Sequence, residues 1–188
     1  MSGGWGRTED PDAAVERILE GADKAFVELG VEKAGMAEVA RFAGCSRGTL
    51  YRYFGTRHAM HTAYVRRKAR QIHQRLETSL GRFDDPRARL VEYVLGAVRA
   101  VREDPAAAAW FVPGVSGTAA RFAHAIDPIE AFAAGLAPED AEPSGEASLR
   151  LRWLVRIIVS LLADPEPNPA DERALVERFA VPAFPGEA

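Results

Sequence analysis

Residues 43–54 read AGCSRGTLYRYF, and this stretch decides how the chain folds. An alanine-rich segment, MAEVARFA at residues 36–43, precedes it and predicts a short helix. Gly44 permits a turn, and Ser46 is a favourable N-cap for a second helix over residues 47–54. Two short helices joined by a glycine-containing turn form a helix-turn-helix, whose second helix can enter the major groove of DNA.

Apolar side chains on one face of each of these helices predict a small shared core. The helix before them has apolar residues at three- and four-residue spacing up to Gly30, and its Phe26 face completes this core. Cys45, the only cysteine, is expected to tuck in as a small apolar residue. A single cysteine also excludes an internal disulfide and fits a reducing compartment. The residues expected to pack between the two helices are Val39, Ala40, Ala43, Leu50 and Phe54.

The other side of the second helix carries side chains suited to DNA. Arg47 at its start can reach guanine edges, and Thr49 can touch a thymine methyl or a phosphate. Tyr51 and Tyr53 offer hydroxyls to phosphates. Helical spacing puts the two tyrosines on different faces, so that either can instead be a packing aromatic. Arg57 adds charge at the start of the following helix, where a helix N-terminus already attracts anions.

Charge is unevenly distributed along the 188 residues, although the net value is only -3. Residues 1–80 hold 13 Lys/Arg and 10 Asp/Glu, whereas residues 81–188 hold 11 and 17. The segment of residues 39–76 has nine basic side chains and no acidic one. A phosphate backbone is the obvious counterpart, because binding releases condensed counterions, whereas a charge run alone usually marks a solvated face. The nine are Arg41, Arg47, Arg52, Arg57, Arg66, Arg67, Lys68, Arg70 and Arg75.

Residues 36–60, MAEVARFAGCSRGTLYRYFGTRHAM, resemble the DNA-binding domain of TetR-family bacterial regulators. With the preceding helix, the resemblance covers about residues 12–65. It implies an all-α homodimer whose variable C-terminal domain binds an effector and alters the spacing of two recognition helices. It also implies which residues touch DNA. These are Arg47 and Thr49 at the bases, Tyr51, Tyr53 and Arg57 at phosphates, and Gly48, whose small size allows close approach to the groove.

One departure from the family pattern shifts these expectations. Relatives often have threonines where this chain has Ala34 and Gly35, and those hydroxyls serve as a helix cap and a phosphate contact. We therefore expect more of the anchoring to fall to Tyr51, Tyr53 and Arg57.

Beyond the helix-turn-helix, the sequence predicts helices throughout and no convincing strand. Proline and glycine mark the breaks, and Asp85-Pro86 and Asp104-Pro105 each place an acidic cap before a proline at the first helical position. We expect an all-α protein with an N-terminal three-helix helix-turn-helix domain followed by a helical effector-binding and dimerisation domain. The predicted divisions are a disordered lead-in (1–11), the DNA-binding domain (12–58) and the C-terminal domain (59–188). The later helices are expected near residues 57–80, 86–103, 105–111, 118–135, 149–163 and 170–179.

The segment LRLRWLVRIIVSLLADP, residues 149–165, is apolar on most of its circumference. A helix of this kind must be buried nearly all round. Burial against a second copy is the natural solution in a small chain, and the segment resembles the penultimate helix of TetR-like dimers. The alternative is the central core helix of a monomer. The closing helix would supply the other half of a four-helix interface through Ala174, Leu175, Arg178 and Phe179.

Aromatic residues in the middle of the chain are candidates for an effector site. They indicate a hydrophobic or amphipathic small molecule, although an aromatic residue of this kind is more often a plain core residue than a pocket wall. His124 lies among apolar neighbours and is interpreted as a satisfied or exposed histidine rather than a ligand contact. The candidate pocket residues are Trp110, Phe111, Phe122 and Phe132.

Other classes of protein are disfavoured by the sequence. His58 and His61 are three residues apart with no carboxylate or thiol nearby, and no phosphate loop or nucleophile elbow appears, so no metal, cofactor or catalytic residue is expected. No apolar stretch approaches the roughly 18 residues that a membrane span needs. The start does not read as a signal peptide, and we expect a cytoplasmic protein.

The leading hypothesis is therefore a repressor that a small molecule releases from a palindromic operator on double-stranded DNA. Two alternatives stay open. One is an effector-independent DNA-binding regulator, and the other is a small-molecule-binding protein with a vestigial helix-turn-helix.

Overall fold

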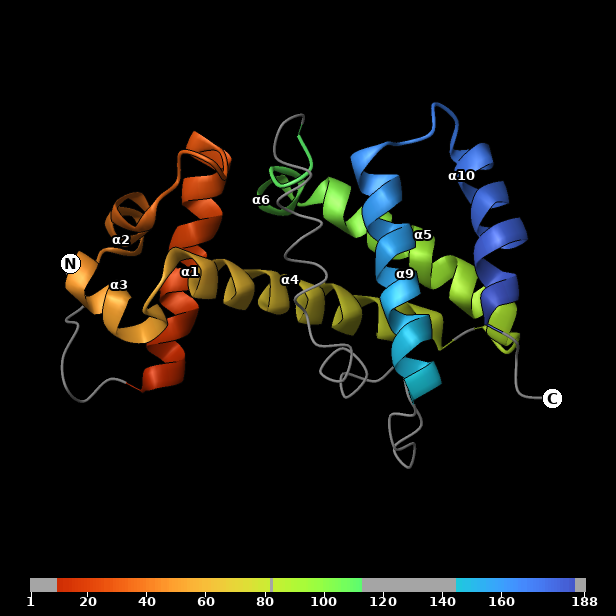
Figure 1. The fold of residues 1–188 in the computed structure, drawn as a ribbon, viewed down its shortest axis with the longest axis horizontal. Coiled ribbons are helices and arrows are strands. Elements are labelled where there is room, and N and C mark those ends of the chain that lie inside the picture. Colours follow the sequence, from red (N-terminus) through yellow and green to blue (C-terminus); the bar gives the residue numbers. More distant parts are fainter. Residues whose placement is uncertain (1–9, 82, 113–144, 185–188) are drawn as a thin grey trace.

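The computed structural model describes residues 10–81, 83–112 and 145–184, and every regular element in these ranges is helical. The expected all-α class is confirmed. Helices α1 to α3 form a compact head at one end of the molecule, and α4 leads lengthwise from it to a body made by α5, α9 and α10 (Figure 1). The helices are α1 (Pro11–Leu29), α2 (Met36–Ala43), α3 (Arg47–Phe54), α4 (Arg57–Leu80), α5 (Pro86–Glu103), α6 (Pro105–Ala108), α9 (Gly145–Ala163) and α10 (Pro169–Leu175).

Short-range capping contacts explain where these helices begin. The hydroxyl of Ser46 accepts a hydrogen bond from Thr49 N at 2.9 Å at the start of α3, and the hydroxyl of Thr56 accepts one from Ala59 N at 3.0 Å at the start of α4. Such side-chain acceptors satisfy N–H groups that have no partner within the helix. Gly44 ends α2 in the left-handed region at φ 69°, which glycine adopts without strain.

Two predicted helices end differently in the structure. The helix expected over residues 105–111 stops at Ala108, because the N–H groups of Trp110 and Phe111 bond carbonyls only three residues back. The last predicted helix, 170–179, changes into a π-helical turn (Val176–Ala180) and then a 3-10 turn (Val181–Ala183). The helix predicted over residues 118–135 lies outside the described residues.

The head has a hydrophobic core that also receives residues from beyond the helix-turn-helix. Leu50 of α3 is fully buried, as are Val39 of α2 and Phe26 of α1, which confirms the predicted packing between these helices. Met60 and Tyr64 of α4 belong to the same cluster. The core of the head therefore extends past residue 58, where the sequence suggested a boundary.

A second core holds the body together. Helices α5 and α9 meet through apolar side chains, and the π-helical turn packs beside them. None of the helices in the described part of the chain combines the length and the hydropathy that crossing a membrane requires. The buried members of this core are Val91, Val94, Val98, Leu151, Leu154, Leu161, Leu162, Val176, Ala180 and Val181.

Candidate nucleic-acid interface

Helix α3 buries one side and leaves the other open. Leu50 points into the head core, whereas Arg47 is exposed and Thr49 is half-buried. Tyr51 is 42% exposed, and Arg47 lies over its ring with the guanidinium carbon 6.0 Å from the ring centroid. A cation that shares an exposed face with a phenol hydroxyl suits contact with a phosphodiester backbone.

The structure separates the two tyrosines. Tyr53 is half-buried and packs against the head core, while Tyr51 stands on the exposed face. Arg52 lies over the Tyr53 ring at 5.3 Å, so this tyrosine also sits beside positive charge. Tyr53 thus fills a packing position as well as facing the charged surface, and Tyr51 is the more available of the two for DNA.

The hydroxyl of Thr49 already has a partner. Its Oγ1 lies 2.9 Å from Ser46 Oγ, which also accepts the hydrogen bond from Thr49 N. The side chain therefore helps to fix the start of α3, and the helix itself sets its orientation.

Gly48 lies on the exposed side of α3 in an ordinary helical conformation. A Cβ atom built there would meet only Ser46 Oγ, at 3.7 Å, which is an ordinary contact. Nothing within the described head therefore requires glycine at this position.

Arg57 makes a contact that the sequence did not indicate. Its Nη2 donates hydrogen bonds to the carbonyl oxygens of Val31 at 2.7 Å and Glu32 at 2.9 Å. The side chain thereby ties the start of α4 to the turn between α1 and α2, although the residue remains exposed. No local signal could have revealed this, because the partners are backbone groups more than 20 positions away.

The structure explains the two positions where relatives often have threonines. Ala34 is fully buried, so a hydroxyl there would need a partner inside the core. Gly35 donates its N–H to Glu38 Oε2 at 3.1 Å, and a Cβ at Gly35 would lie 3.0 Å from that oxygen. Helix α2 is therefore capped by the carboxylate of Glu38 instead of a hydroxyl at its N-cap.

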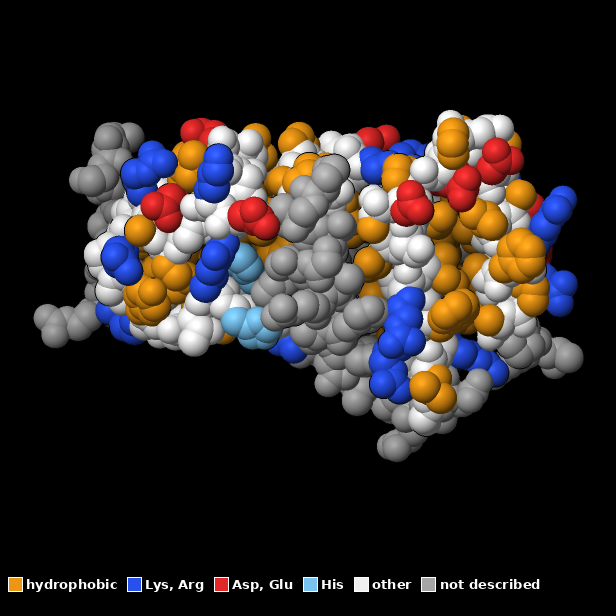
Figure 2. Space-filling model, turned by 45° about the horizontal axis from the view of Figure 1, so that its top comes forward, with side chains coloured by type: hydrophobic (Ala, Val, Ile, Leu, Met, Phe, Trp, Pro, Cys, Tyr) orange, Lys and Arg blue, Asp and Glu red, His pale blue; other side chains and the backbone are white. Residues whose placement is uncertain are grey.

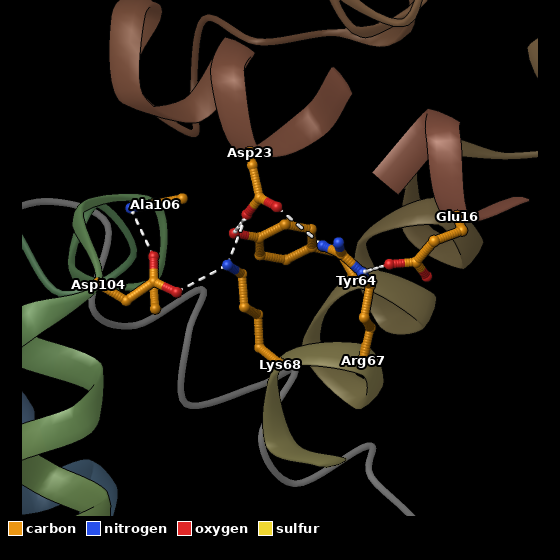
Figure 3. A network of polar contacts seen from close by, with 8 residues as sticks. Glu16, Asp23, Tyr64, Arg67, Lys68, Asp104 and Ala106 are labelled. Atoms are coloured by element: carbon orange, nitrogen blue, oxygen red, sulfur yellow. Dashed lines mark hydrogen bonds and ion pairs between the residues drawn. The ribbon is translucent and has the colours of Figure 1, made fainter. Parts of the chain in front are cut away.

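The basic segment of residues 39–76 needs a correction. Arg67 forms ion pairs with Glu16 and Asp23, at 2.5 and 2.8 Å, and Lys68 pairs with Asp23 and Asp104, both at 2.7 Å. These two cations lie in the interior of the network in Figure 3 and have carboxylate partners within the chain. The expectation that the segment faces phosphates therefore does not apply to these two cations. The sequence did not indicate this, because their carboxylate partners are 36 to 51 positions away.

The candidate effector residues fall in different places. Trp110 is buried in the head core, stacked on Tyr64 at 5.8 Å between ring centroids and edge-on to His61 at 4.9 Å. Phe111 is half-buried and packs against both cores. Phe122 and Phe132 lie outside the described residues, as does His124.

Apolar side chains remain uncovered at the far end of the body. Figure 2 shows hydrophobic side chains gathered over the end that α9 and α10 form. Helix α9 buries Leu151 and Leu154 against α5, but its Trp153 is 45% exposed. Phe179, in the π-helical turn, is 70% exposed. In a single copy of the chain, α9 is thus buried on one side only.

Comparison with known proteins agrees with this architecture. The family model described as "Bacterial regulatory proteins, tetR family" matches residues 18–64, which span most of the head and the start of α4. Over 182 residues, the chain is 37% identical to the HTH-type transcriptional regulator Rv1255c of Mycobacterium tuberculosis strain H37Rv. That alignment covers 95% of this chain and 89% of the relative.

Solved structures share the fold over nearly the whole chain. A TetR transcriptional regulator from Rhodococcus sp. RHA1 superposes with a TM-score of 0.66 at 21% identity, covering 95% of this chain and 100% of the other. The TetR family repressor AlkX from Dietzia sp. gives 0.61 at 20% identity, with coverage of 94% and 96%. RolR in complex with resorcinol gives 0.63 at 21% identity and covers 92% of each chain.

Proposed function

Since the chain belongs to the tetR family of bacterial regulatory proteins and is a DNA-binding transcriptional regulator, we propose that it is a repressor that a small-molecule effector releases from a palindromic operator. One observation carries the DNA-binding part of this proposal. Helix α3 is anchored by Leu50 in the head core and presents Arg47 and Tyr51 on its open side.

The proposed contacts divide into base and phosphate contacts. Arg47 and Thr49 stand at the start of α3, from which a recognition helix reaches base edges, while Tyr51 and Tyr53 reach phosphates. We propose two roles for Arg57. Its Nη2 donates to backbone carbonyls and holds the start of α4, and the exposed side chain also contributes positive charge near the phosphates.

A second copy of the chain is the proposed occupant of the apolar end of the body. Burying Trp153 and Phe179, with their neighbours on α9 and α10, would remove exposed hydrophobic side chains from water. A twofold dimer presents two α3 helices, which suits half-sites about 34–36 Å apart. We expect Phe179→Asp to convert the dimer to a monomer in sedimentation analysis. A dimer that survives both this change and Trp153→Asp would contradict the assignment.

The proposed effector is a small hydrophobic or amphipathic molecule held in the body. RolR, a structural neighbour, is known in complex with resorcinol, which supports a small ligand for this fold. Of the four aromatic candidates, Trp110 and Phe111 lie in the described region, and Phe111 is the better placed of these two because it contacts both cores. Trp110 is buried in the head core, so an effector held in the body would affect it only indirectly, through the packing of the head. On this proposal the chain acts in the cytoplasm and has no catalytic activity.

The test begins with an operator selected from random duplexes by the wild-type protein. Arg47→Ala should weaken binding and relax base preference, whereas Tyr51→Phe should weaken binding to all duplexes alike. Unchanged mobility shifts for Arg47→Ala would show that the contact assignment is wrong.

Two further measurements address the alternatives. Affinity measured at two salt concentrations should fall steeply at the higher one, because phosphate contacts release counterions. Salt-independent behaviour, or no affinity for any duplex, would favour a vestigial helix-turn-helix. Screening metabolites for release of the operator then separates an effector-responsive repressor from a constitutive regulator.

A further inference from the structure

Lys68 lies at the place where the head meets the rest of the molecule. Its ammonium contacts Asp23 of α1 and Asp104 at the junction of α5 and α6, each at 2.7 Å (Figure 3). Asp104 has a second task, since its Oδ1 accepts hydrogen bonds from Ala106 N and Ala107 N and so caps α6. One cation therefore links the head, α4 and the first turn of α6.

The segment from Asp104 to Trp110, which we call the α6 segment, begins at this ion pair. Its other end is held against the head by aromatic packing. Trp110, just beyond α6, lies edge-on to Phe26 of α1 at 5.4 Å and stacks on Tyr64 of α4. The hydroxyl of Tyr64 donates to Asp23 Oδ1 at 2.8 Å, so the aromatic and polar contacts meet at one carboxylate. The α6 segment is thus attached to the head at both ends, and it cannot shift against α1 without breaking one of the two attachments.

The two attachments differ in how they can be broken. The aromatic contact is part of the buried head core, so removing it would disturb folding. The Lys68 side chain lies at the edge of that core and is largely covered, with 13% of it exposed, and the side chain of Asp104 is 21% exposed. This ion pair can be broken with less disturbance of the core, because Lys68→Met removes the charge and keeps most of the apolar volume of the side chain.

We propose that Lys68 is a positioning residue that fixes the orientation of the head against the body through Asp23 and Asp104. In the dimer of the proposed function, on which this inference rests, that orientation sets the separation of the two α3 helices. A full operator requires both heads at the correct separation, whereas a single half-site engages one head only. Loss of the ion pair therefore raises the free-energy cost of aligning both heads on a full operator. It leaves the contacts between each head and its half-site unchanged.

The central experiment compares a duplex that carries the full operator with one that carries a single half-site. For Lys68→Met we expect the dissociation constant of the full operator to rise about tenfold, equivalent to about 1.4 kcal/mol. The half-site constant should stay within about twofold. Asp104→Asn should behave in the same way, because asparagine still caps α6 but presents an amide to the ammonium.

Two controls separate positioning from other roles of Lys68. Arg70→Met removes a positive charge from the same helix at an exposed residue that forms no salt bridge within the described part of the chain. It should affect both duplexes equally. Lys68→Met and Asp104→Asn remove the same ion pair, so their effects should not add. The double variant should bind the full operator about as well as the single variant with the lower affinity.

A distance measurement tests the orientation directly. A spin label at Glu28→Cys, which is exposed on α1, in a Cys45→Ser background gives one label on each head of the dimer. The distance distribution between the two labels should broaden when Lys68→Met is added. Circular dichroism checks that each variant folds.

Each outcome decides the inference. Equal losses on the full operator and the half-site would show that Lys68 contacts DNA or supports the fold of the head, and would overturn positioning. An unchanged full-operator affinity, or an unbroadened distance distribution, would overturn it as well. Failure of the wild-type protein to bind any duplex would overturn the proposed function, and this inference with it.

Discussion

Replacing Gly48 by alanine should raise the stability of the protein and lower its affinity for DNA. The added Cβ would have Ser46 Oγ as its nearest neighbour at 3.7 Å, and the backbone is already helical. Alanine costs less conformational entropy than glycine in a helix, by roughly 0.5–1 kcal/mol, with the lower end expected so close to a helix start. For a chain of this size, 1 kcal/mol corresponds to about 2–4 °C in Tm.

The effect on DNA binding has the opposite sign, because the methyl group would stand where the groove is expected to approach. We expect at least about a tenfold rise in the operator dissociation constant, equivalent to about 1.4 kcal/mol. Thermal unfolding and mobility shifts on one preparation measure both quantities. Undiminished operator affinity in Gly48→Ala would refute close approach at this residue. A lowered Tm would refute the conclusion that the fold has room for the side chain.

Three other changes test the fold. Gly21→Ala should destabilise the head by about 1–3 kcal/mol, because its Cβ would lie 2.6 Å from the backbone nitrogen of Ala43; a Tm equal to that of the wild type would contradict this close packing. Burial holds the pKa of His61 near 4, below its ordinary 6.5, so the unfolded chain binds more protons between these values and stability should fall as pH drops from about 6.5 to 4. His61→Phe should flatten that part of the Tm profile, and an unchanged slope would exclude His61 as its source. Glu172→Gln, which breaks the ion pair at 2.5 Å between the buried Glu172 and the exposed Arg102, should cost about 1 kcal/mol in urea unfolding. An unchanged free energy of unfolding would show that the pair is dispensable.

Helix positions were predictable because their causes are local. Ser46 and Thr56 accept hydrogen bonds from backbone groups three residues ahead, and Gly44 provides the left-handed turn between α2 and α3. Contacts of this range are visible in any short window of sequence. The buried side of α3 was predictable for the same reason, because Leu50 belongs to a helical pattern of apolar residues.

Partners far apart in the chain were not predictable by this means. Lys68 appeared as one more cation in a basic run, and only the fold brings Asp23 and Asp104 to its ammonium. Trp110 appeared as a pocket aromatic, and only the fold places it in the core of the head. Periodicity reports which face of a helix is apolar, but it does not report which distant element covers that face.

The sequence by itself therefore determined the helices, the helix-turn-helix and the exposed face of α3, because each depends on residues within one or two turns of each other. The tertiary structure alone decided which basic residues remain available to phosphates and how the head is joined to the body. Those outcomes depend on long-range ion pairs and aromatic contacts, whose geometry exists only once α1, α4 and the segment from Asp104 to Trp110 have packed together.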